Sequence, residues 1–439
     1  MSAKKPPLSI PSFLTILLTL CVLAGGLFLL ASFHADDPDA QMPAQRIAGV
    51  IANALHGPTL APTPQSTVKT VVVTLAPSSA APTVAVSPTP RADGKSTQPS
   101  RYAFSMTIGG AARFESDISD AAYDKANKAF AYQPILSALA GKTAADLNLL
   151  TLSNVLNIND HKYADVIAPE SVLDAVAAGG FDAVLLNTEH CMDQGAQGAL
   201  DTVAAIQKRG MSCLGINAAS CTQHALIQLN GARLALLTYT DSITNKGKTT
   251  LAQQSDVSLT LFDAKRAAAD IQTVRQQGAS CVIVFMHWGA AEASGVTKTM
   301  RERAKELAAA GADIVLGVHP TRVLPLEYIE TRDVGTARKT LVAYSLGTLL
   351  GESREGYDIS GLLLHLNIVC TENGVMFEQV EYTPTYIWRQ AVAGKTIYRV
   401  LCSADEAPQE MNDNQRAVMS RALKRIQDTM KKTPAAQRK

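Results

Sequence analysis

The stretch Asn187-Thr-Glu-His-Cys-Met-Asp-Gln-Gly195 stands between a predicted strand and a predicted helix. The strand is the short apolar run at residues 181–186, and the helix continues to about Gly210 with apolar side chains at a helical period. Glu189 and His190 therefore follow the carboxyl end of a strand, where an α/β sheet opens onto its ligand-binding crevice. The alternative interpretation is that this segment is only a turn and that His190 is a hydrogen-bonded polar residue at its edge.

Two further histidines follow predicted strands. His287 comes after the buried run 281–286, and His319 comes after the run 314–318. Imidazole and carboxylate groups gathered at strand ends are the ligands that zinc, iron or manganese needs. Each histidine taken alone is more simply a hydrogen-bonded residue, but three at equivalent positions, together with Glu189, favour a site.

Composition gives no reason to expect a nucleic-acid partner. The chain has 439 residues, a net charge of +1 and 5% aromatic residues. Nucleic-acid binding needs a basic surface, or a basic stripe with aromatic side chains on which bases stack. Neither feature is present in this sequence.

The N-terminus carries a targeting signal. Residues 13–32 form an uncharged apolar run long enough to cross a bilayer as a helix. Lysines precede the run and aspartates follow it, so the positive-inside rule keeps residues 1–12 in the cytoplasm. We expect a single-pass protein of the cell membrane with an extracytoplasmic C-terminal domain; a cleaved signal peptide is the alternative. Residues 33–100 are rich in Pro, Ala, Ser and Thr and predict an extended tether.

Residues 101–402 form the predicted globular domain. Strands and helices alternate over its first part, with helices expected at 121–139 and within 164–178, which predicts an α/β fold. The later part is mainly strands, which favours a second, partly antiparallel sheet. The extension 403–439 carries a polar amphipathic helix over about 410–432.

Six cysteines lie beyond the membrane run at irregular spacing and without a CxxC pair. Export permits disulfides. Cys213 and Cys221 flank one predicted strand and could pair, whereas Cys281 begins a buried strand and is expected to be a core thiol.

Five groups of motifs, in order along the chain, resemble the CapA-type poly-γ-glutamate capsule synthesis proteins. They are Thr188-Glu-His-Cys-Met-Asp-Gln-Gly195, His287-Trp-Gly289, Ala310-Gly-Ala-Asp313 with Gly317-Val-His-Pro-Thr321, Tyr344-Ser-Leu-Gly-Thr348, and Tyr382-Thr-Pro-Thr385. The resemblance covers roughly residues 102–401. It implies a metallophosphatase-like α/β/β/α sandwich of two mixed sheets flanked by helices.

The chain departs from the family pattern where the resemblance implies metal ligands. The first strand ends in Gly109-Gly110, where the family has Gly-Asp, and Glu115 and Asp117 lie nearby but out of register. The family's acidic residue after the second strand has no counterpart near Ser153-Asn-Val155, and Glu189, Thr321 and Thr348 also differ from the family. A two-metal centre usually needs a bridging carboxylate. We therefore predict one divalent metal ion (Mn, Zn or Fe) or none.

The resemblance implies seven site residues with three roles. They are His190 as the catalytic proton donor, Glu189, His287 and His319 as the metal ligands, and Asp193, Trp288 and Arg322 as binding residues. An imidazole suits proton donation near neutral pH.

Three functions are compatible with these features. In the first, the chain takes part in making or exporting an anionic surface polymer of the poly-γ-glutamate type, and binds the polymer or a polymer-synthase protein with little or no catalysis. In the second, it is a single-metal-dependent hydrolase or transferase acting on phosphoester or glutamyl amide bonds. In the third, favoured by the long tether, it is a structural surface or adhesion protein.

Overall fold

The computed structural model describes residues 73–74, 101–158, 163–253, 256–333, 336–352, 356, 358–392, 394–402, 407–431, 433 and 437–438. The predicted membrane helix at 13–32 and the tail at 1–12 lie outside these residues, as does almost all of the tether at 33–100. The described residues belong to one compact unit, Thr67–Lys439. No helix in this described part is long and apolar enough to span a membrane.

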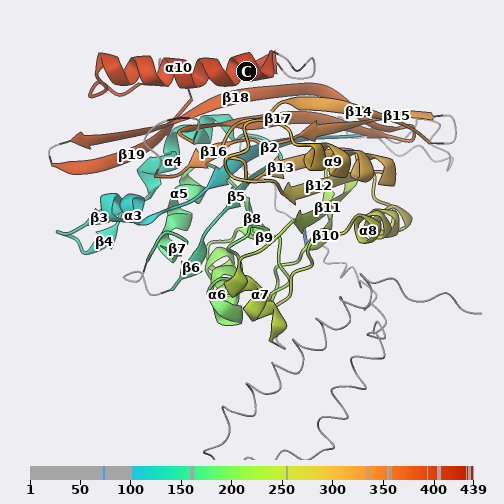
Figure 1. Cartoon of the computed structure of the whole chain (residues 1–439), viewed down its shortest axis with the longest axis horizontal. Helices are drawn as coiled ribbons and strands as arrows, with labels where there is room; N and C mark the ends of the chain where they lie inside the picture. The colour runs from blue at the N-terminus through green and yellow to red at the C-terminus, as the bar shows by residue number, and fades with distance from the viewer. Residues whose placement is uncertain are drawn as a thin grey trace, which may run out of the picture. The chain divides into compact units, whose positions relative to one another are not determined.

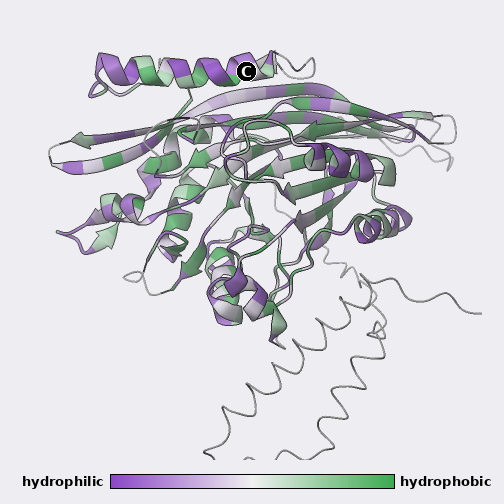
Figure 2. Ribbon diagram, in the orientation of Figure 1, coloured by the Kyte–Doolittle hydropathy of each residue, from purple (hydrophilic) through white to green (hydrophobic). Residues whose placement is uncertain are grey.

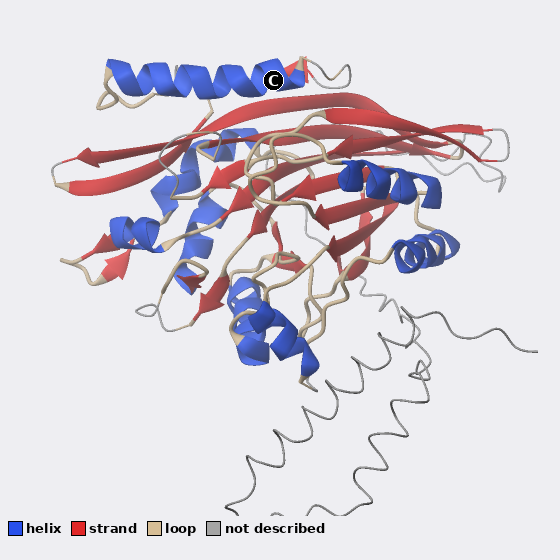
Figure 3. Cartoon of the chain, viewed as in Figure 1, coloured by secondary structure: helices blue, strands red, loops and turns tan. Residues whose placement is uncertain are grey.

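Two mixed β-sheets form the centre of this unit (Figures 1 and 3). Within the described residues, the seven-stranded sheet runs in the order β1 (Val73–Thr74), β10 (His224–Leu229), β11 (Ala232–Thr240), β12 (Cys281–His287), β13 (Ile314–Val318), β15 (Thr336–Ala343) and β14 (Leu326–Asp333). The nine-stranded sheet runs β19 (Lys395–Leu401), β18 (Gly374–Val392), β17 (Ser360–Thr371), β2 (Tyr102–Ala112), β5 (Leu147–Leu152), β8 (Ala183–Leu185) and β9 (Ser212–Leu214), with β16 (Thr348–Leu350) beside β2 and β20 (Gln437–Arg438) beside β18.

The facing sides of the two sheets share one apolar core. In β12, Ile283 and Phe285 point into this core, whereas Val282 and Val284 point to the opposite side. This alternation follows from the period of two along a strand. Because both sides of β12 are buried, its sequence is a continuous apolar run rather than an alternating one.

Helices cover the outer side of each sheet. On the seven-stranded sheet these are α8 (Ala264–Gln276) and α9 (Lys298–Ala310). On the nine-stranded sheet they are α3 (Ser116–Ala122), α4 (Gln133–Leu136), α5 (Leu173–Ala178) and α6 (Gly195–Lys208). Figure 2 shows polar residues on the exposed surfaces of α8 and α9, as expected of amphipathic helices.

The C-terminal helix α10 (Asp413–Met430) confirms the amphipathic helix predicted over 410–432. It packs along β18 and β17 (Figure 1). On β18, Tyr382 points into the core between the sheets, and Tyr386 and Trp388, which lie on the same side of the strand, pack under α10. The helix therefore covers part of the sheet face that also packs against the seven-stranded sheet.

The helix predicted over 121–139 is wrong. This segment contains the end of α3, a hairpin of β3 (Tyr123–Asp124) and β4 (Ala129–Phe130), then α4 and the 3-10 helix η1 (Ser137–Lys142). Asp124 ends the helical pattern because its carboxylate accepts a hydrogen bond from the backbone N–H of Ala126 at 2.9 Å and thereby fixes a turn.

The predicted second, partly antiparallel sheet is present, but the late strands are divided between the two sheets. β14 and β15 complete the seven-stranded sheet, whereas β17, β18 and β19 extend the nine-stranded sheet from β2. β17 pairs antiparallel with β2, with Leu366 opposite Met106. Both sheets thus combine strands distant in sequence, which a local pattern does not reveal.

The six described cysteines are free thiols. Cys281 is fully buried in the core between the sheets, as predicted. Cys213 and Cys221 do not form the disulfide that their spacing would allow.

Asp313, directly before β13, is a buried carboxylate with three polar partners. Its Oδ2 accepts hydrogen bonds from Arg275 Nη2 at 2.5 Å and from Val282 N at 2.7 Å. Its Oδ1 accepts one from Arg338 Nη2 at 2.9 Å. Asp313 therefore connects α8 and β15 to the central strand β12.

Asp313→Ala should lower the free energy of unfolding by about 3–5 kcal/mol, because it leaves two partly buried arginines without their counter-ion. Asp428→Ala is the matched control. It removes an exposed partner of Lys424 on α10 and should leave the free energy of unfolding nearly unchanged, because solvent screens exposed ion pairs. Urea unfolding of both variants measures the difference, and equal losses would contradict the structural role given to Asp313.

Candidate functional site

The carboxyl ends of β8 and of β11, which belong to different sheets, meet at Asn187. The side-chain Nδ2 of Asn187 donates to the carbonyl of Tyr239 at 3.0 Å, and its backbone carbonyl accepts from Thr240 Oγ1 at 2.7 Å. Asn187 is fully buried. These bonds bring the turn that follows β8, with Glu189, beside the strand ends of the other sheet.

The N-terminal end of a helix also fixes this turn. Thr244, the N-cap of α7 (Asn245–Ala252), donates its backbone N–H to the carbonyl of Glu189 at 3.2 Å. Its hydroxyl donates to the carboxylate of Asp193 and accepts from Gly247 N at 3.0 Å. Both ends of the segment from Glu189 to Asp193 are therefore held by one capping residue.

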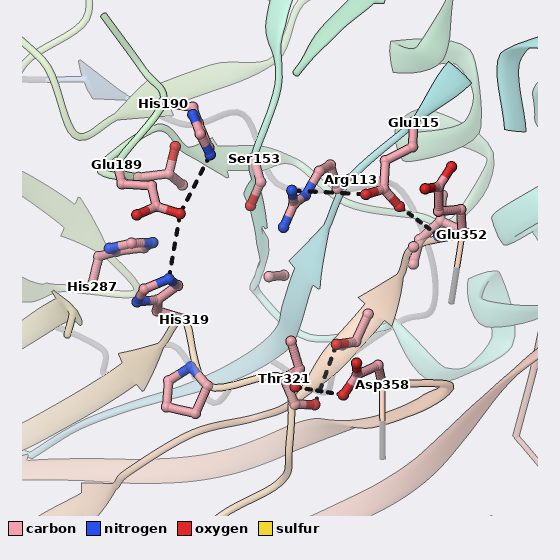
Figure 4. A pocket seen from close by; sticks show the side chains of 17 residues that line it. Arg113, Glu115, Ser153, Glu189, His190, His287, His319, Thr321, Glu352 and Asp358 are labelled. Carbon is pink, nitrogen blue, oxygen red and sulfur yellow. Dashed lines mark hydrogen bonds and ion pairs between the residues drawn. The ribbon is translucent and has the colours of Figure 1, made fainter. Parts of the chain in front are cut away.

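Two imidazoles converge on the carboxylate of Glu189 (Figure 4). Its Oε1 lies 3.3 Å from His190 Nε2 and 3.4 Å from His319 Nε2. The other nitrogen of each ring is engaged: His190 Nδ1 lies 2.7 Å from Asp193 Oδ2, and His319 Nδ1 lies 3.0 Å from the carbonyl of Gly289. Since a carbonyl and a carboxylate can only accept, each Nδ1 donates and each Nε2 faces Glu189.

The contacts of Glu189 with His190 and His319 shift the pKa values of Glu189 and His190. The hydrogen bonds from His190 and His319 hold the pKa of Glu189 well below its usual range. Glu189, with a smaller contribution from Asp193, raises the pKa of His190. The cluster is therefore an ionised carboxylate beside an imidazole that favours its protonated form.

His287, the last residue of β12, is neutral. Its ring stacks on His319 with the ring centroids 4.3 Å apart. Burial, with a smaller contribution from His319, lowers the pKa of His287 to about 3. The imidazole of His287 is therefore an uncharged neighbour of His319 near neutral pH.

The backbone of His319 is strained. Its φ is 101°, a value uncommon for a residue with a Cβ. Such a conformation costs about 1–3 kcal/mol and persists where the surroundings enforce it. Here the hydrogen bond to Gly289 holds the ring with its Nε2 toward Glu189.

Glu189, His190, His287 and His319 line one side of a cavity of about 320 Å³. Figure 4 shows the polar side chains that complete it. These are Arg113, Glu115, Ser153, Thr321, Glu352 and Asp358. The cavity is polar and carries charges of both signs.

The structure brings four of the seven predicted site residues into the cavity wall: Glu189, His190, His287 and His319. Asp193 lies behind His190 and orients it. Trp288 is fully buried in the core of the seven-stranded sheet, where its indole N–H donates to the carbonyl of Tyr344 at 2.9 Å. Arg322 does not line the cavity; its Nη1 donates to the carbonyl of Ser294 at 3.2 Å.

Other cavity residues were not selected from the sequence. Ser153, Thr321 and Thr348 line the cavity, so the departures from the family pattern did mark it. Glu115 reaches the cavity too, although its position in the sequence is out of register with the family's Asp. Three charged cavity residues belong to no motif and gave no signal: Arg113, Glu352 and Asp358.

The donor groups do not form a metal site in this arrangement. Among the described residues, no group of three or more His, Cys, Asp or Glu side chains is arranged so that it could hold a metal ion. Glu189 Oε1 is engaged by two imidazoles, and His287 lies face to face with His319. Of the two alternatives left open by the sequence, one divalent metal ion or none, this arrangement does not fit the first.

Gly110, at the position where the family has Asp, lies in close contact with the segment before β16. A Cβ at Gly110 would lie 2.3 Å from the carbonyl oxygen of Gly347 and 3.0 Å from that of Leu346. The neighbouring Ala111 N–H donates to Gly347 O at 3.1 Å. The backbone thus occupies the space that a side chain at residue 110 would need.

Comparison with known proteins gives a family and two relatives. The bacterial capsule synthesis protein family PGA_cap matches residues 105–353, more than half of the chain. The capsule biosynthesis protein CapA of Bacillus anthracis is 26% identical over 185 residues, which are 42% of this chain and 43% of that protein. The PGA biosynthesis protein CapA of Bacillus subtilis (strain 168) is 26% identical over 220 residues, which are 48% of this chain and 54% of that protein. The chain spans about half the length of these relatives.

Two solved structures are similar at low sequence identity. The NAD nucleotidase NadN of Haemophilus influenzae has a TM-score of 0.41 and 12% identity, over 77% of this chain and 57% of that one. The calcineurin-like phosphoesterase YfkN of Bacillus subtilis has a TM-score of 0.37 and 11% identity, over 75% of this chain and 100% of that one.

Gly110→Ala should lower the free energy of unfolding by about 1–3 kcal/mol, because the added methyl group forces β2 away from the segment before β16. Gly295→Ala is the matched control, since a Cβ there meets no atom within 4 Å, and it should change stability by less than about 0.5 kcal/mol. Thermal and urea unfolding measure both. Equal stability of the two variants would show that this close contact does not exist in solution.

Proposed function

Since the chain belongs to the bacterial capsule synthesis protein family PGA_cap, we propose that it takes part in the synthesis or export of an anionic surface polymer. The polymer is of the poly-γ-glutamate type, because two relatives are a capsule and a PGA biosynthesis protein. The proposed role is binding: the polymer or a partner protein enters the cavity, with little or no catalysis.

The state of Glu189 gives this proposal its main support. Its carboxylate oxygen Oε1 is in contact with His190 and His319 rather than left free to coordinate a metal. The positions that differ from the family present the hydroxyl groups of Ser153, Thr321 and Thr348 to the cavity wall. Hydroxyl groups donate and accept hydrogen bonds, which suits the carboxylates and amides of a glutamyl polymer.

We also propose that residues 13–32 anchor the chain in the cell membrane and that the globular domain is extracytoplasmic. The apolar run and the charges on either side of it support this orientation. The domain would then work beside polymer-synthase proteins in the same membrane, at the side where the polymer emerges.

The His190–Asp193 pair favours a second candidate, hydrolysis or group transfer at phosphoester or glutamyl amide bonds. The two side chains lie 2.7 Å apart, so Asp193 fixes the ring and stabilises its protonated form. If a leaving group takes the place of Glu189 Oε1 beside His190 Nε2, the imidazole can donate its proton to that group.

Deletion of the gene in its host should strongly reduce the surface polymer, and the wild-type gene on a plasmid should restore it. In a binding role, His190→Ala should still support most polymer production, because no proton transfer is required. Polymer per cell is measured together with the amount of the protein by immunoblot. Unchanged polymer after deletion would contradict the proposal, and loss of polymer with His190→Ala at a normal protein level would favour the second candidate.

The purified chain, produced with added manganese, zinc and iron, should contain no stoichiometric metal and should not hydrolyse phosphoesters or γ-glutamyl amides. The reason is that Glu189 and its two imidazoles satisfy one another. Elemental analysis of the wild type and of a His287→Ala, His319→Ala double variant measures this. A full equivalent of metal in the wild type that is lost in the double variant would refute the expectation and support a metal-dependent enzyme.

A further inference from the structure

We propose that Arg113 is the anion-binding residue of the cavity and holds a carboxylate of a γ-linked glutamyl chain. The choice of ligand rests on the proposed function, whereas the anion-binding role of Arg113 stands on the structure. Among the described residues that line the cavity, Arg113 is the single residue of the lysine and arginine type.

The backbone of Arg113 is fixed at the edge of the cavity. Arg113 directly follows β2, and its N–H donates to the carbonyl of Leu350 in β16 at 2.9 Å. The next residue, Phe114, is fully buried, and its N–H and carbonyl are bonded to the side chain of Asn154 at 2.7 and 3.1 Å. The guanidinium thus extends from a rigid base.

The guanidinium group of Arg113 has N–H donors that can bind a ligand. Its nearest acidic neighbour is Glu115, with 3.7 Å between Arg113 Nη1 and Glu115 Oε1, longer than a hydrogen bond. To the residues that the structure describes, the Arg113 side chain donates no hydrogen bond, although a guanidinium carries five N–H donors. Its side chain is 36% exposed. A ligand can therefore reach a planar pair of donors that suits a carboxylate.

Glu115 is held in place independently of Arg113. Its Oε2 accepts a hydrogen bond from the backbone N–H of Glu352 at 2.5 Å. Burial raises the pKa of Glu115 despite the nearby arginine. Its carboxyl group thus lies beside the guanidinium of Arg113 without occupying its donors.

The surroundings favour a carboxylate over a phosphate. Glu115, Glu352 and Asp358 line the same cavity, so a doubly charged phosphate meets more repulsion than a singly charged carboxylate. The cavity volume of about 320 Å³ corresponds to about ten water molecules at about 30 Å³ each. It therefore accommodates one or two glutamyl units of a longer chain at a time.

Isothermal titration calorimetry of the full chain with γ-linked triglutamate, α-linked triglutamate and inorganic phosphate tests this inference. Arg113→Met should weaken binding of γ-linked triglutamate at least about tenfold. Arg113→Lys should weaken it less, because lysine keeps the positive charge but lacks the paired N–H donors of the guanidinium. Glu115→Gln should tighten binding several-fold, since it removes the competing carboxylate. Arg421→Met, on the exposed side of α10, is the matched control and should leave binding unchanged.

The outcomes separate this inference from the proposed function. Binding of γ-linked triglutamate that Arg113→Met and Arg113→Lys leave intact would overturn the role of Arg113 and keep the proposed function. Binding of phosphate alone, lost in Arg113→Met, would support the anion site and overturn both the glutamyl ligand and the proposed function. Binding of none of the three probes by the wild type would overturn the inference. If Arg113→Met fails to fold, weaker binding by Glu115→Gln would still refute it.

Discussion

The hydrogen bonds of Asn187 are the connection on which the candidate site depends. Glu189 and His190 follow a strand of the nine-stranded sheet, whereas His287 and His319 follow strands of the seven-stranded sheet. The apolar core between the sheets does not by itself set their relative position along the strand direction, because hydrophobic burial is not directional. Asn187 sets it, since its side chain and its backbone carbonyl bond to consecutive residues at the end of β11. Together with the hydrogen bonds from Thr244 to Glu189 and Asp193, this connection brings the four side chains together.

Once the sheets are joined, charge determines the arrangement of the cluster. A partly buried carboxylate needs partners, and Glu189 finds them in His190 and His319. Each imidazole is in turn fixed from behind, by Asp193 and by the carbonyl of Gly289. Asp313 follows the same rule elsewhere in the fold, but its partners are arginines and its role is structural. The difference is access: Asp313 is enclosed by the core, whereas Glu189 opens onto a cavity.

Local signals in the sequence were sufficient where an element is fixed by its own residues. Helix α9 is such an element, because Thr297 caps its start and Gly311, with a φ of 112°, ends it. The hairpin within 121–139 escaped prediction because the turn chemistry of Asp124 competes with a helical composition. The distribution of late strands between the sheets depends on contacts between distant segments and has no local signal. The same holds for the site: histidines at strand ends were predicted, whereas Arg113, Glu352 and Asp358 reach the cavity only through tertiary structure.

The position of Arg113 is linked to the glycine at residue 110. Because Gly110 has no Cβ, β2 can approach the segment before β16 closely enough for Ala111 N–H to bond to Gly347 O at 3.1 Å. The same approach lets Arg113 N–H bond to Leu350 O at 2.9 Å, which fixes the residue whose side chain enters the cavity. A Cβ at residue 110 would lie 2.3 Å from the carbonyl oxygen of Gly347, so this close approach of the two segments requires glycine there. The fixed backbone of Arg113 is therefore part of the same arrangement as the glycine at residue 110.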